Sequence, residues 1–449
     1  MRRGVRPSVI AAIAVPITFT LACLQAPGPN GAALSGAASG DPDAEVRDFR
    51  IHELAARVRT MPPGVDRDYF AGILASRAAR SEEALRLLNG VLPVLRETQP
   101  QRAAVALEAL AETYSATYRY RDASRIYEEL APLASHLPQP VDDDVALARI
   151  LADAPAQTIA WTGPVRLKTS RNPIGSVNGT LTVGGTPVEW LLDTGANYSV
   201  VSRSLARQLG LTPLAGAAMV GSGVTGLKSA LEVGIVPRVE IGGATVSHVV
   251  AIILEDANLR VGPEGNAYQI HAILGYPVLR ALGRVTFTRQ GEFLAGEAAE
   301  QARTSAPMFM RGLTPAVECE VAGEPLLFTF DTGASSSNFS VRYYERFRQD
   351  AKSWRTSTVE SGGAGGTVKR EMFVQPRVHL KVGGANVALK DVTIFSTAMN
   401  AGIDVLFGNL GQDFVDGFDS FTLDFSTMTF RLGAPTAPHS ARQPIGAQP

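Results

Sequence analysis

The sequence of 449 residues has few of the side chains that build disulfide frameworks and metal centres. Its two cysteines, Cys23 and Cys319, are too few for either a disulfide scaffold or a cysteine zinc site. Its six histidines are scattered, without the spacing of metal ligands. The formal net charge is −1, so no overall field favours nucleic acid or an anionic membrane. We therefore expect no metal, no cofactor and no nucleic-acid partner.

The amino-terminal end lacks an apolar run long enough for a comfortable membrane span, which takes roughly 20 residues. Three arginines within the first six residues precede a mostly apolar stretch, 8–22, which suits a signal peptide. Residues 20–23 then resemble a bacterial lipobox, with Thr20 in place of the usual leucine. We predict that 1–23 is a signal peptide and that Cys23 is lipidated. An ordinary cleaved signal and an uncleaved anchor are the alternatives.

These features predict an exported protein, periplasmic or in the cell envelope, that meets the membrane only through a lipid anchor. Residues 24–42 are rich in Gly, Ala, Pro and Ser, and we expect a flexible tether. Once Cys23 carries a lipid, Cys319 is left without a partner. It lies in an alternating apolar stretch, so we interpret it as a small core residue.

Residues 43–154 are predicted to be helical, because apolar residues recur at spacings of three and four. Small and aromatic residues in this region resemble the pattern of tetratricopeptide helical hairpins. The clearer copy comprises Leu107, Leu110, Ala111, Tyr114, Ala123, Tyr127 and Leu130, and the weaker one Gly72, Ala75, Ala84, Leu88 and Val91. So few hairpins are marginal as a free solenoid, and we expect them to pack on the rest of the chain. They serve either as a groove for a protein partner or as a structural spacer.

Two copies of one tetrapeptide, Asp-Thr-Gly-Ala, organise the remaining chain. They occupy 193–196 and 331–334, and each follows an apolar run that reads as a strand. Further features recur around them in the same order. These are a glycine eight residues before each Asp (Gly185, Gly323), a Gly-rich loop (221–223, 362–363), a glycine pair (242–243, 383–384) and an apolar pair ending in glycine (273–275, 406–408). Two homologous lobes, 165–300 and 306–433, are the simplest explanation.

This pattern resembles the aspartic proteases, and its compact lobes are similar to retropepsin subunits. The resemblance implies a multidomain chain, with an α-helical, tetratricopeptide-like domain followed by an all-β bilobal aspartic-protease fold. The Pro-containing tail, 434–449, is predicted to be disordered.

The resemblance implies an aspartic endopeptidase whose Asp193 and Asp331 activate a water molecule for attack on a peptide bond of a polypeptide substrate. The residues that would support the pair are Thr194, Gly195, Thr332 and Gly333. The apolar segments 273–275 and 406–408 would buttress the two loops. The substrate-binding flaps would include Gly221, Ser222, Gly223, Gly362 and Gly363.

Two other interpretations remain open. In the first, the fold is a peptide-binding module that recruits partners and turns over little or no substrate. In the second, the chain is catalytic but pairs its lobes between two molecules. The sequence leaves open whether Asp193 and Asp331 meet within one chain.

Overall fold

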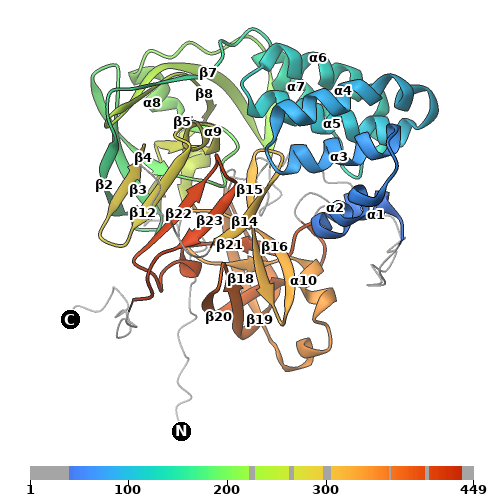
Figure 1. Cartoon of the computed structure of the whole chain (residues 1–449). Coiled ribbons are helices and arrows are strands. Elements are labelled where there is room, and N and C mark those ends of the chain that lie inside the picture. Colours follow the sequence, from blue (N-terminus) through green and yellow to red (C-terminus); the bar gives the residue numbers. More distant parts are fainter. Residues whose placement is uncertain are drawn as a thin grey trace.

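The computed structural model describes residues 40–221, 228–261, 267–296, 305–363, 366–399 and 404–436. A helical region at the amino-terminal end is followed by a β-rich region with two lobes, as Figure 1 shows. This arrangement confirms the predicted fold class. No described helix combines the length and the apolar character needed to span a membrane.

The helical region is a series of short hairpins. Its helices are α1 (Pro42–Arg47), α2 (Ile51–Thr60), α3 (Val65–Arg77), α4 (Ser81–Thr98), α5 (Pro100–Ala116), α6 (Tyr120–Leu130), the 3-10 helix η1 (Ala131–His136) and α7 (Asp142–Leu151). Helices α3 and α4 form one hairpin and α5 and α6 the next. Helix α3 approaches α4 so closely that a Cβ atom at Gly72 would lie 2.6 Å from Leu88 Cδ2. The tetratricopeptide-like assignment of these hairpins stays a prediction.

The first lobe surrounds a sheet that carries the first Asp-Thr-Gly-Ala loop. Its elements are β1 (Thr158–Trp161), β2 (Val165–Arg171), β3 (Val177–Val183), β4 (Thr186–Leu192), β5 (Ser199–Ser202), α8 (Arg203–Gln208), β6 (Ala218–Gly221), β7 (Lys228–Ile241), β8 (Ala244–Leu254), η2 (Asp256–Leu259), β9 (Arg260–Val261), β10 (Tyr268–Gln269), β11 (Ala272–Leu274), α9 (Tyr276–Ala281), β12 (Arg284–Thr288) and β13 (Glu292–Ala295).

The second lobe repeats this plan. Its elements are β14 (Ala306–Arg311), β15 (Thr314–Val321), β16 (Glu324–Phe330), β17 (Asn338–Phe339), α10 (Val341–Arg346), η3 (Asp350–Ser353), β18 (Arg355–Gly363), β19 (Gly366–Val382), β20 (Ala385–Phe395), β21 (Gly408–Leu410), η4 (Gln412–Phe414), β22 (Ser420–Asp424) and β23 (Thr429–Leu432). Strand β5 pairs in parallel with β8, and β17 pairs in parallel with β20 at the equivalent place. Cys319 lies fully buried in β15, which confirms its interpretation as a core residue.

One antiparallel sheet joins the lobes, in the order β2-β13-β12-β22-β23-β14. Each lobe contributes three strands, and the two lobes meet where β12 pairs with β22. At that junction Phe287 stacks on Phe421, with 4.8 Å between the ring centroids. The shared sheet fixes the two lobes of one chain against each other.

Two predicted boundaries need correction. Helix α1 begins at Pro42, so the last residue of the predicted tether is helical. The predicted disordered tail is wrong for residues 434–436, because Pro435 bridges to Phe418 and the Thr436 N–H donates to the Gly417 carbonyl.

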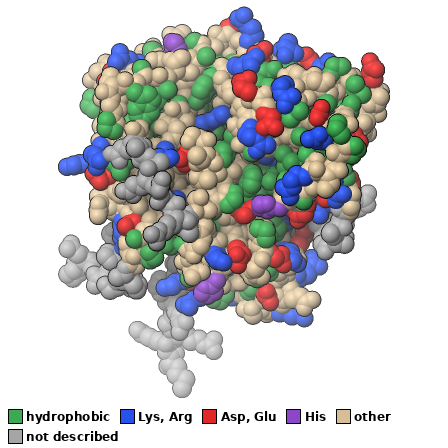
Figure 2. Space-filling model, viewed as in Figure 1, with side chains coloured by type: hydrophobic (Ala, Val, Ile, Leu, Met, Phe, Trp, Pro, Cys, Tyr) green, Lys and Arg blue, Asp and Glu red, His purple; other side chains and the backbone are tan. Residues whose placement is uncertain are grey.

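On the face shown in Figure 2, basic and acidic side chains are interspersed.

Candidate active site

The two Asp-Thr-Gly-Ala loops begin at equivalent points of the two lobes. Each Asp directly follows a strand, β4 in the first lobe and β16 in the second. Strand β4 pairs in parallel with β11, and β16 pairs in parallel with β21. The Asp193 N–H donates to Leu274 O at 3.0 Å, and the Asp331 N–H donates to Leu410 O at the same distance. The backbone therefore presents both aspartates in the same way.

The two threonines lock the loops together across the lobe interface. The Thr194 N–H donates to Thr332 Oγ1 at 3.0 Å, and the Thr332 N–H donates to Thr194 Oγ1 at 3.1 Å. Each hydroxyl also donates to the opposite strand end, Thr194 to Phe330 O at 2.8 Å and Thr332 to Leu192 O at 2.7 Å. All four groups are buried, so losing one would leave a polar partner unpaired.

The two glycines let each loop pass against the opposite carboxyl. A Cβ atom at Gly195 would lie 2.6 Å from Asp331 Cγ, and one at Gly333 would lie 2.6 Å from Asp193 Oδ2. Each glycine N–H donates to the carboxyl of its own loop, at 2.7 Å in both cases. The structure therefore brings Asp193 and Asp331 together within one chain, with room between the loops only for glycine.

The paired carboxyls are buried, and this determines their charge. Burial raises the pKa of Asp193, while a hydrogen bond with Asp331 and backbone N–H donors oppose the rise. The pKa of Asp331 lies well above its ordinary value, because burial and the neighbouring Asp193 both disfavour its charged form. Two carboxyls this close retain one shared proton over a range of pH. Both pKa values are raised, so the shared proton belongs to the pair rather than to either aspartate.

The buttress of the second loop differs from the sequence prediction. In the first lobe, Ile273 and Leu274 pair with the strand that leads to Asp193, as predicted. In the second lobe, Asn409 and Leu410 take these positions, followed by Gly411. The prediction that 406–408 forms the buttress is therefore wrong. A search for apolar residues does not find Asn409, because its side chain is polar. Asn409 is nevertheless buried, and its Oδ1 accepts a hydrogen bond from Thr329 Oγ1 at 2.6 Å.

Several side chains that the sequence analysis missed support the loops. Ser199 Oγ accepts the Gly275 N–H, and Ser337 Oγ accepts the Gly411 N–H, each at 3.1 Å. These serines occupy the same place in the two repeats, so aligning the repeats beyond the tetrapeptide could have found them. Ser176 crosses between the lobes, where its hydroxyl donates to Gly333 O at 2.7 Å.

The predicted flap residues that the structure describes, Gly221, Gly362 and Gly363, lie at the ends of paired strands. Gly221 ends β6, which pairs with β7, whereas Ser222 and Gly223 lie outside the described residues. Gly362 and Gly363 end β18, which pairs with β19. Strand β19 also reaches β9 of the first lobe. The flap role of these residues stays a prediction. Cys23, the predicted lipidation site, also lies outside the described residues.

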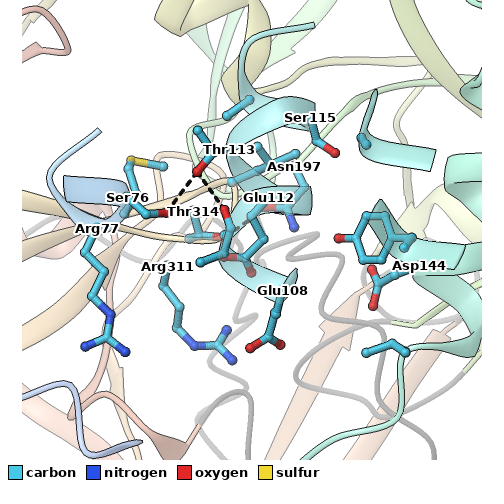
Figure 3. Close-up of a pocket in the computed structure, with 18 of the residues that line it drawn as sticks. Ser76, Arg77, Glu108, Glu112, Thr113, Ser115, Asp144, Asn197, Arg311 and Thr314 are labelled. Carbon is cyan, nitrogen blue, oxygen red and sulfur yellow. Dashed lines mark hydrogen bonds between the residues drawn. The ribbon is translucent and has the colours of Figure 1, made fainter. Parts of the chain in front are cut away.

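A cavity of about 230 Å³ lies between the helical region and the lobes, next to the first loop. Figure 3 shows Glu108 and Glu112 projecting from α5, Asp144 nearby, and Arg311 opposite them. The lining of the cavity also includes Asn197 of the first loop. The Oδ1 of Asn197 accepts a hydrogen bond from Thr314 Oγ1 at 2.9 Å. Neither member of the aspartate pair lines this cavity.

Burial in this cavity raises the pKa of Glu112 and of Asp144 to about 8. The charge of Glu108 raises both further, whereas Arg311 opposes the rise at Glu112 and Lys228 opposes it at Asp144. Glu112 and Asp144 are therefore mostly protonated at neutral pH. Within the residues that the structure describes, no three His, Cys, Asp or Glu side chains are placed to hold a metal ion.

Comparison with known proteins agrees with the repeat. Residues 179–278 and residues 317–414 each match the family model described as aspartyl protease. Each match contains one Asp-Thr-Gly-Ala loop together with its buttress strand, and neither extends into the helical region. Comparison with curated proteins gives no match. The two matches to this family model support a protease-type, hydrolytic function for the chain.

Proposed function

We propose that the chain is an aspartic endopeptidase that uses the Asp193–Asp331 pair to hydrolyse peptide bonds in polypeptides. The observation that carries the proposal is that equivalent loops of one chain bring two buried carboxyls together, each against the glycine of the opposite loop. A binding module would not need two buried carboxyls held against each other, because each raises the cost of ionising the other.

The proposed reaction uses water as the nucleophile. A water molecule bound between the carboxyls gives a proton to the ionised aspartate of the pair as its oxygen attacks the peptide carbonyl carbon. The protonated aspartate of the pair donates its proton to the carbonyl oxygen, which gives a gem-diol. Transfer of a proton to the amide nitrogen then releases the amine and the carboxylic acid. The threonine and glycine contacts keep the two carboxyls in a fixed geometry throughout the reaction.

The direct test is cleavage of an unfolded protein by the purified chain over a series of pH values. We expect Asp193→Asn and Asp331→Asn each to lower kcat by at least about 100-fold, because each removes a proton-transfer group. Asparagine nearly preserves side-chain size, so both variants should stay folded by circular dichroism. Cleavage that survives in both variants would reject the proposal, and wild-type protein that binds but never cleaves peptides would favour the binding module.

The proposal extends to location and partners. An exported protein held in the envelope by a lipid on Cys23 fits the amino-terminal sequence, and the helical region would offer a surface for a protein partner. Loss of fatty-acid labelling in Cys23→Ser tests the anchor. Labelling that persists in this variant would contradict it.

A further inference from the structure

The two catalytic loops of the proposed enzyme are held from behind in different ways. In the second lobe, the support comes from the lobe itself. The Gln412 N–H donates to Ala334 O at 2.9 Å, and its side-chain Nε2 donates to Thr332 O at 2.7 Å. The next residue, Asp413, accepts a hydrogen bond from Ser337 Oγ at 2.7 Å. Two side chains of η4 thus hold the loop that begins at Asp331.

The first lobe lacks these two side-chain contacts. The Tyr276 N–H donates to Ala196 O at 2.8 Å, so Tyr276 occupies the position of Gln412. Its hydroxyl, however, points to Met310 Sδ at 3.4 Å rather than to the loop. Pro277 occupies the position of Asp413 and has no side-chain group that can accept the equivalent hydrogen bond.

The helical region supplies contacts at this place instead. Tyr118, in the turn between α5 and α6, donates its hydroxyl to Pro277 O at 2.7 Å. Gln157, in the connector between α7 and β1, also donates its Nε2 N–H to this carbonyl, at 3.1 Å. In return, Arg280 of α9 donates to Ala116 O at the end of α5. The turn between α5 and α6 is thus fastened to α9, the helix that follows the buttress of the first loop.

A second contact reaches the loop directly. Tyr198 lies five residues after Asp193, is buried, and lines the cavity together with Ser115 of α5. Figure 3 shows Ser115 on α5 on the same side of the cavity as Asn197, the neighbour of Tyr198. The backbone of Tyr198 also packs tightly on Gly275, since a Cβ atom there would lie 2.5 Å from the Tyr198 carbonyl.

We propose that the helical region is a brace for the Asp193 loop, and that Tyr118 is a positioning residue for the proposed reaction. The inference rests on the proposed function, because it assigns the brace to one of the two catalytic aspartates. The helices hold α9 and Tyr198, and these hold the loop, at the place where the second lobe uses Gln412 and Asp413. Losing the Tyr118 contact would therefore loosen the Asp193 loop, whereas Gln412 and Asp413 would still hold the Asp331 loop.

The test compares Tyr118→Phe with a matched control, Tyr344→Phe, in the full chain. Tyr118→Phe removes only the hydroxyl that reaches Pro277, whereas Tyr344 lies in an aromatic cluster of the second lobe. In Tyr118→Phe we expect faster amide hydrogen exchange in 193–198 and unchanged exchange in 331–336. We also expect kcat to fall about tenfold with KM nearly unchanged, since misplacement of one catalytic group impairs the transition state more than binding. The control should match wild type in every measurement.

Gln412→Ala provides the reciprocal variant, in which exchange should rise in 331–336 and not in 193–198. The proposal that the helices brace the first loop would be overturned if amide exchange in 193–198 were unchanged in Tyr118→Phe. An equal rise of the exchange rate in both loops would also overturn it. The exchange experiment needs no substrate. If the wild-type protein cleaves nothing, the proposed function fails, while the comparison of the two loops still decides whether the helices hold the first one.

Discussion

At the scale of single residues, the site depends on groups whose size and polarity leave little freedom. Asp193 and Asp331 are buried, each loop threads a glycine past the opposite carboxyl, and the threonine hydroxyls cross between lobes. The sequence could predict these residues because each is part of a repeated motif. It could not predict Ser176 or Gln412, because their partners are backbone carbonyls that only the folded chain brings near.

Replacing Gly195 with alanine tests this close approach. The added Cβ would lie 2.6 Å from Asp331 Cγ, so the loops must move apart. We expect Gly195→Ala to destabilise the protein by about 1–3 kcal/mol, as overpacking does, and to abolish most cleavage. Gly417→Ala is the control, because a Cβ at Gly417 meets nothing within 4 Å. Thermal unfolding and cleavage rates measure both. A Gly195→Ala protein with wild-type activity would show that the gap is wider than described.

At the scale of elements, the sequence predicts the strands that lead to the two aspartates, but it places the buttress strand of the second loop three residues too early. The predicted segment, 406–408, and the segment observed, 409–411, both end in leucine or phenylalanine followed by glycine, and 406–408 is the more apolar of the two. The chain instead places Asn409 beside Thr329, where its amide oxygen is satisfied. Hydrophobicity alone cannot identify such a strand, because burial of a polar side chain depends on a partner from another strand.

Truncating the buttress tests the corrected register. Leu410 is fully buried, and its carbonyl accepts the Asp331 N–H, whereas Leu406 is buried farther from the loop, with its carbonyl bound to Ser340. Leu410→Ala and Leu406→Ala should each cost about 2–5 kcal/mol of folding free energy. Under conditions where both variants are folded, we expect the loss of kcat to be larger for Leu410→Ala. Equal kcat values, or a larger loss for Leu406→Ala, would contradict the assignment of Leu410 to the buttress.

At the scale of the whole molecule, the helical region and the two lobes are joined by contacts that local sequence patterns do not predict. The lobes share a sheet whose central pair, β12 and β22, comes from segments far apart in the sequence. The expectation that the helices pack on the rest of the chain is confirmed by the contacts of Tyr118 and Arg280. Apolar side chains of the helices, among them Leu147 and Leu151, also join the core of the lobes. Where the helices pack could not be predicted, because Tyr118 binds a backbone carbonyl that only the folded first lobe presents.

The cavity between these bodies makes stability depend on pH. The ordinary pKa values of Glu112 and Asp144 are 4.5 and 3.8, and burial raises both to about 8. Between these limits each of the two carboxyls holds more protons in the folded protein than in the unfolded chain, so their contribution to stability is fully present at low pH and is lost as pH rises towards 8. We expect Tm to decrease between pH 5 and pH 8 in wild type and to decrease less in Glu112→Gln and Asp144→Asn. Identical slopes in all three proteins would show that these carboxyls ionise freely in the folded state.

The most direct test of the central claim, that the two aspartates of one chain form one active site, is an equimolar mixture of Asp193→Asn and Asp331→Asn proteins. Each chain in the mixture keeps one intact loop. If the site forms within a chain, the mixture should cleave no faster than either variant alone, while wild-type protein at the same total concentration cleaves normally. Recovery of cleavage upon mixing would contradict the account, because it would require lobes of two different chains to pair.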